Sequence, residues 1–254
     1  MSAPAIDLAI LWPALAAGLL VTATHVPLGM QVLQRGIVFI DLAVAQIAGL
    51  GVVMADWLGS EPRGAAVQVA ALAAALAGAL LLHWTERRWP EVQEAVIGVT
   101  FVVAANAAIL LLAANPHGAE HLKDLLIGQV LWVRPATLAW VALVYAAILV
   151  LWFQLGERIG RIGFYLLFAC AVTISVQQVG LYLVFATLIV PALATRRFGR
   201  ARLAAGYALG VLGYAVGLAL SLPTDLPPGP LIVCAMVALG VACALLRPRA
   251  RLPG

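Results

Sequence analysis

Arg35-Gly-Ile-Val-Phe-Ile-Asp41-Leu-Ala-Val-Ala-Gln46-Ile-Ala-Gly49-Leu-Gly51 is an almost uninterrupted apolar stretch that contains one aspartate. A carboxylate inside a membrane span is energetically costly, so it is expected to have a function. Similar apolar stretches recur along the chain, which is 64% hydrophobic and 10% charged, whereas soluble domains are about 25% charged. The composition therefore predicts an all-α fold, a polytopic bundle of transmembrane helices.

The region 164–195 determines how many times the chain crosses the membrane. As one helix it would be about 48 Å long, against a hydrocarbon core of about 30 Å. Gln177, Gln178 and Gly180 interrupt it near its middle. Hydropathy predicts eight or nine membrane segments in a single transmembrane domain over residues 1–254. With this region broken in two, they lie near 8–33, 37–58, 64–84, 94–115, 136–155, 164–179, 181–195, 203–222 and 230–246.

The distribution of basic residues favours nine segments. With nine, 12 of the 15 basic residues lie at the same side as the C-terminus; with eight, only 10 do. Because cytoplasmic ends of membrane proteins carry an excess of arginine and lysine, we expect the N-terminus outside and the C-terminus inside. The net charge of +4 therefore reflects membrane topology and lipid contact, and it does not indicate a nucleic-acid partner.

Motifs for nucleotide hydrolysis and other common enzymatic chemistry are absent from the sequence. There is no GxxxxGK[ST] loop, and Lys123 is the only lysine, so this chain is not expected to bind ATP itself. No GxSxG, HExxH or CxxC pattern occurs either. We expect a protein that is not an enzyme and that holds no cofactor.

Three polar residues in the first two segments are candidate metal ligands. Asp41 is predicted about one and a half turns inside the second segment, and His25 lies in the first within about 6 Å of the same depth. If they face each other, a histidine and a carboxylate could bind a transition metal. The alternatives are an Asp41 that caps a helix or pairs with Arg35, and a His25 bonded to a backbone carbonyl. The Gln46 amide could be a weak metal ligand, or it could form a hydrogen bond to a neighbouring helix.

A second group of candidate ligands lies in the connection after the fourth segment. His117, His121 and Asp124 have the spacing i, i+4, i+7, which places them on one face if this stretch is helical. Such a face suits transient metal capture at the outer mouth of a transporter. The alternative is a solvated connector without a ligand.

The chain resembles the integral-membrane permeases of bacterial ABC importers for zinc and manganese over nearly its whole length. The most specific segment is Val176-Gln-Gln-Val-Gly-Leu-Tyr-Leu-Val-Phe-Ala-Thr-Leu-Ile-Val-Pro-Ala-Leu-Ala-Thr-Arg196, similar to the Val-Gly…Leu-Ile-x-Pro-Ala-x-x-Ala-Arg run of these permeases. The segments Val32–Gly51, with an arginine turn before an aspartate helix, and Leu125-Leu-Ile-Gly-Gln-Val-Leu131 also match.

The resemblance implies an all-helical permease that works as a homodimer in the bacterial inner membrane. Its partners would be two cytoplasmic ATP-binding subunits and an extracytoplasmic metal-binding protein. A divalent metal, zinc first and manganese next, would be the cargo. The alternatives are a permease for a metal chelate such as haem or a siderophore, and a proton-coupled secondary transporter that uses Asp41 as its proton carrier.

The sequence departs from the family pattern at two positions. The family usually has a histidine four residues after the aspartate, and this chain has Ala45 there; His25 could replace it from a neighbouring helix. The segment that docks into the ATPase is reduced to Gly156-Glu-Arg-Ile-Gly-Arg-Ile-Gly163, in which Glu157, Arg158 and Arg161 are candidate contacts.

Overall fold

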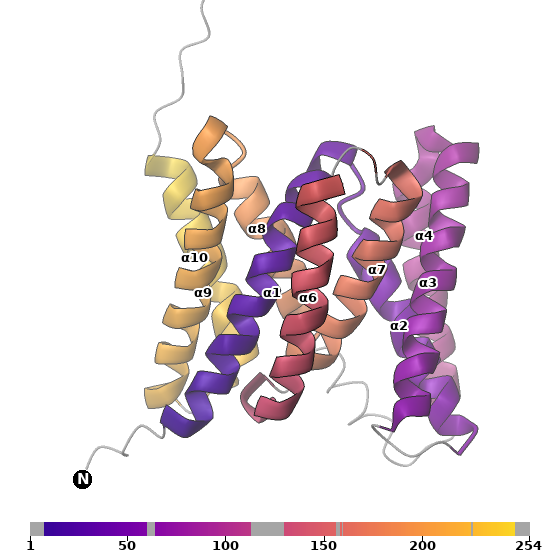
Figure 1. Cartoon of the computed structure of the whole chain (residues 1–254), viewed down its shortest axis with the longest axis horizontal. Helices are drawn as coiled ribbons and strands as arrows, with labels where there is room; N and C mark the ends of the chain where they lie inside the picture. Colours follow the sequence, from indigo (N-terminus) through magenta and orange to yellow (C-terminus); the bar gives the residue numbers. More distant parts are fainter. Residues whose placement is uncertain are drawn as a thin grey trace, which may run out of the picture.

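The computed structural model describes residues 8–59, 64–112, 130–155, 158, 160–224 and 226–246. In these residues the chain forms nine α-helices and no strand (Figure 1). The helices are α1 (Leu8–Arg35), α2 (Ile40–Trp57), α3 (Ala65–Arg88), α4 (Gln93–Leu112), α6 (Pro135–Leu155), α7 (Gly160–Val179), α8 (Leu181–Ala194), α9 (Arg202–Thr224) and α10 (Pro228–Leu246). Three short 3₁₀ turns lie between them, η1 (Pro90–Val92), η2 (Val130–Trp132) and η4 (Gly199–Ala201). The predicted all-α fold is confirmed.

Eight of the nine helices are long and apolar enough to cross a membrane, and α8 is the shorter ninth. The break between α7 and α8 falls at Gly180, as the sequence predicted. Gly180 has φ +86°, a left-handed conformation that glycine adopts without a steric penalty, and its N–H donates to the Val176 carbonyl. At 14 residues α8 is about 21 Å long, so it does not reach across the hydrocarbon core.

The helices form two packed groups joined by α6 and α7. In Figure 1, α9, α10, α1 and α8 lie together on the left, α2, α3 and α4 on the right, and α6 and α7 between them. Helix α1 packs against α8 and α9, whereas α2 packs against α3, α4 and α7. The core is built from buried aromatic and aliphatic side chains, and the largest are Tyr145, Tyr165, Tyr214, Phe164 and Phe168.

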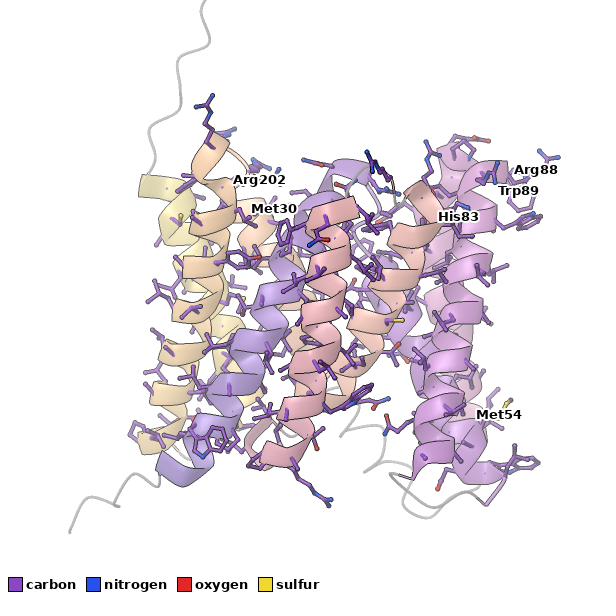
Figure 2. The ribbon with its side chains drawn as sticks, in the orientation of Figure 1. Met30, Met54, His83, Arg88, Trp89 and Arg202 are labelled. Atoms are coloured by element: carbon purple, nitrogen blue, oxygen red, sulfur yellow. The ribbon has the colours of Figure 1, made fainter. Side chains whose placement is uncertain are left out.

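Most of the described arginines lie at one end of the bundle. Arg88, at the end of α3, and Arg202, at the start of α9, lie at the same end in Figure 2, and Met54 lies at the other. Arg35 is the last residue of α1, and Arg161 is the second residue of α7. The positive-inside rule assigns this end to the cytoplasm, which is the orientation predicted from the sequence.

Helices α1 and α8 approach each other closely at Gly29 of α1. A β-carbon at this position would lie 1.9 Å from the Leu188 carbonyl oxygen, a backbone atom of α8 that cannot rotate away. Glycine is therefore needed for α1 and α8 to approach this closely, as small residues commonly are where membrane helices meet.

We expect Gly29→Ala to lower the thermal stability of the purified protein, because α1 and α8 must separate to relieve the clash. Overpacking of this kind costs about 1–3 kcal/mol. Gly98→Ala is the matched control, since nothing lies within 4 Å of a β-carbon there. Thermal unfolding in detergent, followed by tryptophan fluorescence, checks both. Equal melting temperatures for the two variants would contradict the close approach.

Candidate functional site

Asp41 is the second residue of α2, and its side chain is fully buried. The sequence placed it one and a half turns inside a segment starting near residue 37, but the turn through Gly36, with φ +70°, delays the helix until Ile40. Asp41 therefore lies in the first turn, where free backbone N–H groups favour a negative charge. Its oxygens lie near the N–H groups of Asp41 and Leu42 but make no well-aligned hydrogen bond.

The Arg35 guanidinium does not pair with Asp41. It lies over the Phe164 ring of α7, 4.3 Å from the ring centroid, and one of its nitrogens is buried without a hydrogen-bond partner. Within the described part of the chain, no arginine or lysine comes within 4.0 Å of the Asp41 carboxylate. The alternative of a structural Asp41–Arg35 pair is therefore wrong.

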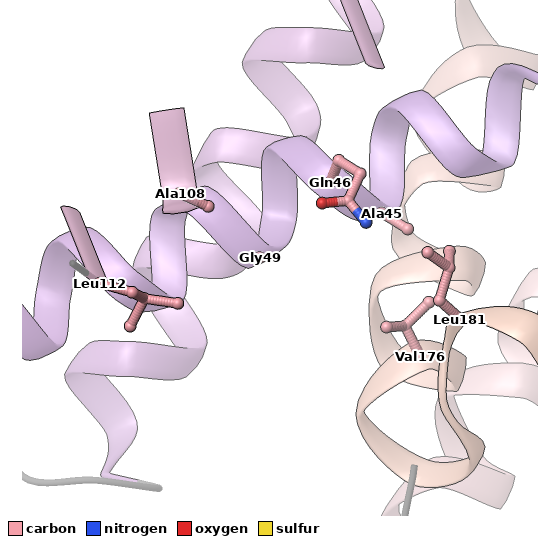
Figure 3. Close-up of a pocket in the computed structure, with 7 residues that line it drawn as sticks. All are labelled: Ala45, Gln46, Gly49, Ala108, Leu112, Val176 and Leu181. Atoms are coloured by element: carbon pink, nitrogen blue, oxygen red, sulfur yellow. The ribbon is translucent and has the colours of Figure 1, made fainter. Parts of the chain in front are cut away.

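A small pocket lies along the same face of α2 as Asp41 (Figure 3). Asp41, Ala45 and Gly49 are each one turn apart, and the last two line the pocket, so it begins about 6 Å along the helix from Asp41. Its lining comes from four helices and is apolar except for the Gln46 amide: Ala45, Gln46 and Gly49 of α2, Ala108 and Leu112 of α4, Val176 of α7 and Leu181 of α8. Ala45, at the position where similar permeases usually have a histidine, therefore lines this pocket.

His25 lies in the interior of α1 with no exposed surface. Its Nδ1 is 3.0 Å from the Val21 carbonyl oxygen and 3.0 Å from the Thr24 hydroxyl, and its Nε2 has no partner. This hydrogen bond to the Val21 carbonyl is the structural role expected for His25 as the alternative to metal binding. Helices α1 and α2 both contact α7 and α8 but make no substantial contact with each other, so His25 and Asp41 do not lie on directly packed helices in the described structure.

The remaining candidates are at the ends of the bundle or outside the described residues. Arg158 and Arg161 are exposed at the cytoplasmic end, before and within the first turn of α7. His117, His121, Asp124 and Glu157 lie outside the described residues. Among those that are described, no group of three or more histidine, cysteine or acidic residues is arranged to hold a metal ion.

Sequence reasoning missed the polar residues at the start of α4. The N–H of Phe39, just before α2, donates to Glu94 Oε1 over 3.3 Å, and Gln93 Nε2 donates to the Leu82 carbonyl over 2.9 Å. Gln93 Oε1 also accepts a hydrogen bond from the Thr85 hydroxyl. These bonds fix the turn between α3 and α4 to the start of α2. The only signal in the sequence was an acidic residue at the start of a span, which is common at helix N-termini.

Comparisons with known proteins identify relatives over almost the whole chain. Residues 7–159 and 154–247 match the ABC 3 transport family. The high-affinity zinc uptake system membrane protein ZnuB of Haemophilus influenzae is 24% identical, over 94% of this chain and 98% of the relative. An uncharacterized membrane protein of Synechocystis is 26% identical, over 92% of this chain and 90% of its own.

Two solved structures share the fold. PsaBC from Streptococcus pneumoniae, in complex with Fab, superposes with a TM-score of 0.78 at 19% identity and covers 96% of this chain and 94% of that chain. A structure described as a metal-chelate type ABC transporter in an inward-facing conformation gives a TM-score of 0.70 at 15% identity, over 92% and 85% of the two chains.

We expect Asp41→Asn to raise the stability of the metal-free protein. The substitution removes a buried carboxylate without a partner, and burial of an unsatisfied polar group costs about 1–3 kcal/mol, more for a charged one. Asp56→Asn, on the same helix but partly exposed near its other end, is the control and should change little. Thermal unfolding in the presence of a chelator measures both. A clear loss of stability in Asp41→Asn would show that the carboxylate has a structural partner.

Proposed function

The chain belongs to the ABC 3 transport family, and on this premise we propose that it is the permease subunit of an ATP-driven importer of a divalent transition metal. Zinc is the first candidate and manganese the second. The observation that carries the proposal is the fully buried, unpartnered Asp41 carboxylate, one helical turn from a pocket between four helices. Carboxylates bind divalent ions, and unpaired ionisable groups within membrane domains mark transport paths.

The relatives support zinc as the first candidate. The Haemophilus influenzae relative is a zinc uptake protein, and it aligns over nearly its full length. The proposed path follows the face of α2 that begins with Asp41 and runs along Ala45 and Gly49. Because Ala45 supplies no ligand, the Gln46 amide is the next polar group available to a passing ion. His25, with its unpartnered Nε2, is proposed as a second contact that would be reached from α1.

Energy for transport would come from a separate subunit, because the chain lacks a phosphate-binding loop. We place the ATP-binding partner at the cytoplasmic end, on the exposed arginines beside the start of α7. An extracytoplasmic metal-binding protein would deliver the ion at the opposite end, and a second copy of this chain would complete the path. The membrane would be the bacterial inner membrane.

The primary test of the proposal is uptake of radioactive zinc in a host strain deleted for this chain. Wild-type protein should restore uptake, and Asp41→Asn should reduce it about tenfold or more at an equal level in the membrane, since one lost interaction of 1.4 kcal/mol is a factor of ten. Asp56→Asn should behave as wild type. His25→Ala with unchanged uptake would remove His25 from the path and leave the role of Asp41 intact.

Competition and purification separate the alternatives to zinc import. Unlabelled zinc and manganese should compete with the tracer in that order, whereas competition by haem or a siderophore alone would indicate a metal-chelate permease. Affinity purification from the native membrane should recover an ATP-binding subunit. If that subunit is absent and uptake collapses with the proton gradient, the chain is a secondary transporter and the proposal is wrong.

We expect the double substitution Arg158→Glu and Arg161→Glu to weaken assembly with the ATP-binding subunit. Both side chains are exposed at the cytoplasmic end, so reversing their charge should repel an acidic docking surface without disturbing the core. Arg134→Glu, an exposed arginine before α6 at the opposite end, is the matched control. The measured quantity is the ratio of the two subunits after purification. An unchanged ratio would exclude this docking role.

A further inference from the structure

Glu94 has two carboxylate oxygens in different situations. Oε1 accepts the N–H of Phe39 over 3.3 Å, a contact between residues 55 positions apart that brings Glu94 to the start of α2. Oε2 is buried and has no hydrogen-bond partner. The first oxygen therefore holds α4 against the start of α2. The carboxylate also lies near the Val38 N–H, but Oε2 makes no well-aligned hydrogen bond and can accept a further ligand.

Asp41 lies two residues beyond Phe39, whose N–H donates to Glu94, so the two carboxylates lie near each other at the start of α2. Both Asp41 oxygens are buried without a partner, so this corner holds three unpartnered carboxylate oxygens from two helices. No lysine or arginine of the described residues forms an ion pair with either group, and Arg35 lies over Phe164 instead. Asp41 is fully buried and Glu94 is partly exposed. Two neighbouring carboxylates repel each other unless a cation or a proton lies between them.

The two carboxylates also stand on the helix faces that line the pocket. On α2, Asp41 shares a face with Ala45 and Gly49. On α4, Leu112 is 18 residues from Glu94, which is five complete turns, so it lies on the same face. The seam between α2 and α4 thus has the pocket along its length and the paired carboxylates at its cytoplasmic end.

We propose that Glu94 and Asp41 together form a divalent-cation site at the cytoplasmic end of the α2–α4 seam. Glu94 keeps Oε1 on the Phe39 N–H and offers Oε2 to the ion, while Asp41 offers both of its oxygens. Carboxylate oxygens, completed by water, suit divalent ions such as Mn²⁺ and Zn²⁺. The inference rests on the proposed function, because it names a second residue for the same metal path, located where the ion would leave toward the cytoplasm.

The experiment is zinc binding to the purified permease with its ATP-binding partner in detergent, measured by isothermal titration with ZnCl₂ alone. The informative variant is Glu94→Gln, whose amide oxygen can still accept the Phe39 N–H although its charge is lost. We expect its zinc affinity to fall about 10- to 100-fold and its zinc-induced rise in melting temperature to disappear, because changes around a metal site commonly have effects of this size. Its metal-free melting temperature should not fall, because the Phe39 contact is kept and the repulsion between the two carboxylates is removed.

Glu91→Gln is the matched control, because Glu91 is an exposed acidic residue of the same turn. It should bind zinc as wild type does. Wild-type affinity in Glu94→Gln together with weakened binding in Asp41→Asn would show that Glu94 only anchors the start of α2, and the proposed transport function would stand. Wild-type affinity in both variants, with normal uptake by Asp41→Asn, would overturn this site and the proposed metal path together.

Discussion

The arrangement of the bundle depends on the start of α2, because side chains of α4, α7 and α8 contact this turn. The Phe39 ring stacks on Phe185 of α8 with centroids 6.1 Å apart, and its N–H bonds to Glu94 of α4. Just before the turn, Arg35 lies over Phe164 of α7. These contacts connect the group of α2, α3 and α4 with the rest of the bundle. The carboxylate of Asp41 is buried at this turn, so a movement of either group changes its surroundings.

The break at Gly180 explains why a pocket exists beside α2. In a continuous helix, Val176 and Leu181 would point in different directions, because residues five apart differ by about 140° around the axis. The turn at Gly180 instead allows both side chains to line the same pocket. Irregular backbone is tolerated at membrane depth only where protein or a cavity surrounds it. Gly180 is itself buried, and its N–H and carbonyl are bonded to Val176 and Val184. The break is therefore satisfied internally and leaves the space at Ala45 open.

Much of the fold could be predicted from the sequence, because hydropathy and charge are properties of local segments. The nine segments, the break near Gly180 and the arginine-bearing end all follow from them, and Asp41 stood out as a lone carboxylate in an apolar run. The exact start of α2 depended on a turn at Gly36 that hydropathy does not detect. The contact between Phe39 and Glu94 is tertiary and spans 55 residues, so no local pattern shows it. Likewise, an estimate of depth in the membrane could not tell that α1 and α2 make no substantial contact or that His25 bonds to the Val21 carbonyl of its own helix.

The chemistry of the proposed path affects where metal selectivity can arise. With alanine at position 45, the groups along α2 and at the start of α4 are carboxylates and one amide, all oxygen donors. Imidazole favours zinc and copper, whereas oxygen donors accept manganese, magnesium and calcium as well, so an oxygen path discriminates weakly among divalent ions. Selection would then depend on the proposed contact with the His25 imidazole or on the proposed extracytoplasmic binding protein. A weakly discriminating path has a mechanical advantage for a transporter, because an ion bound by few ligands can leave at the cytoplasmic end once the start of α2 moves.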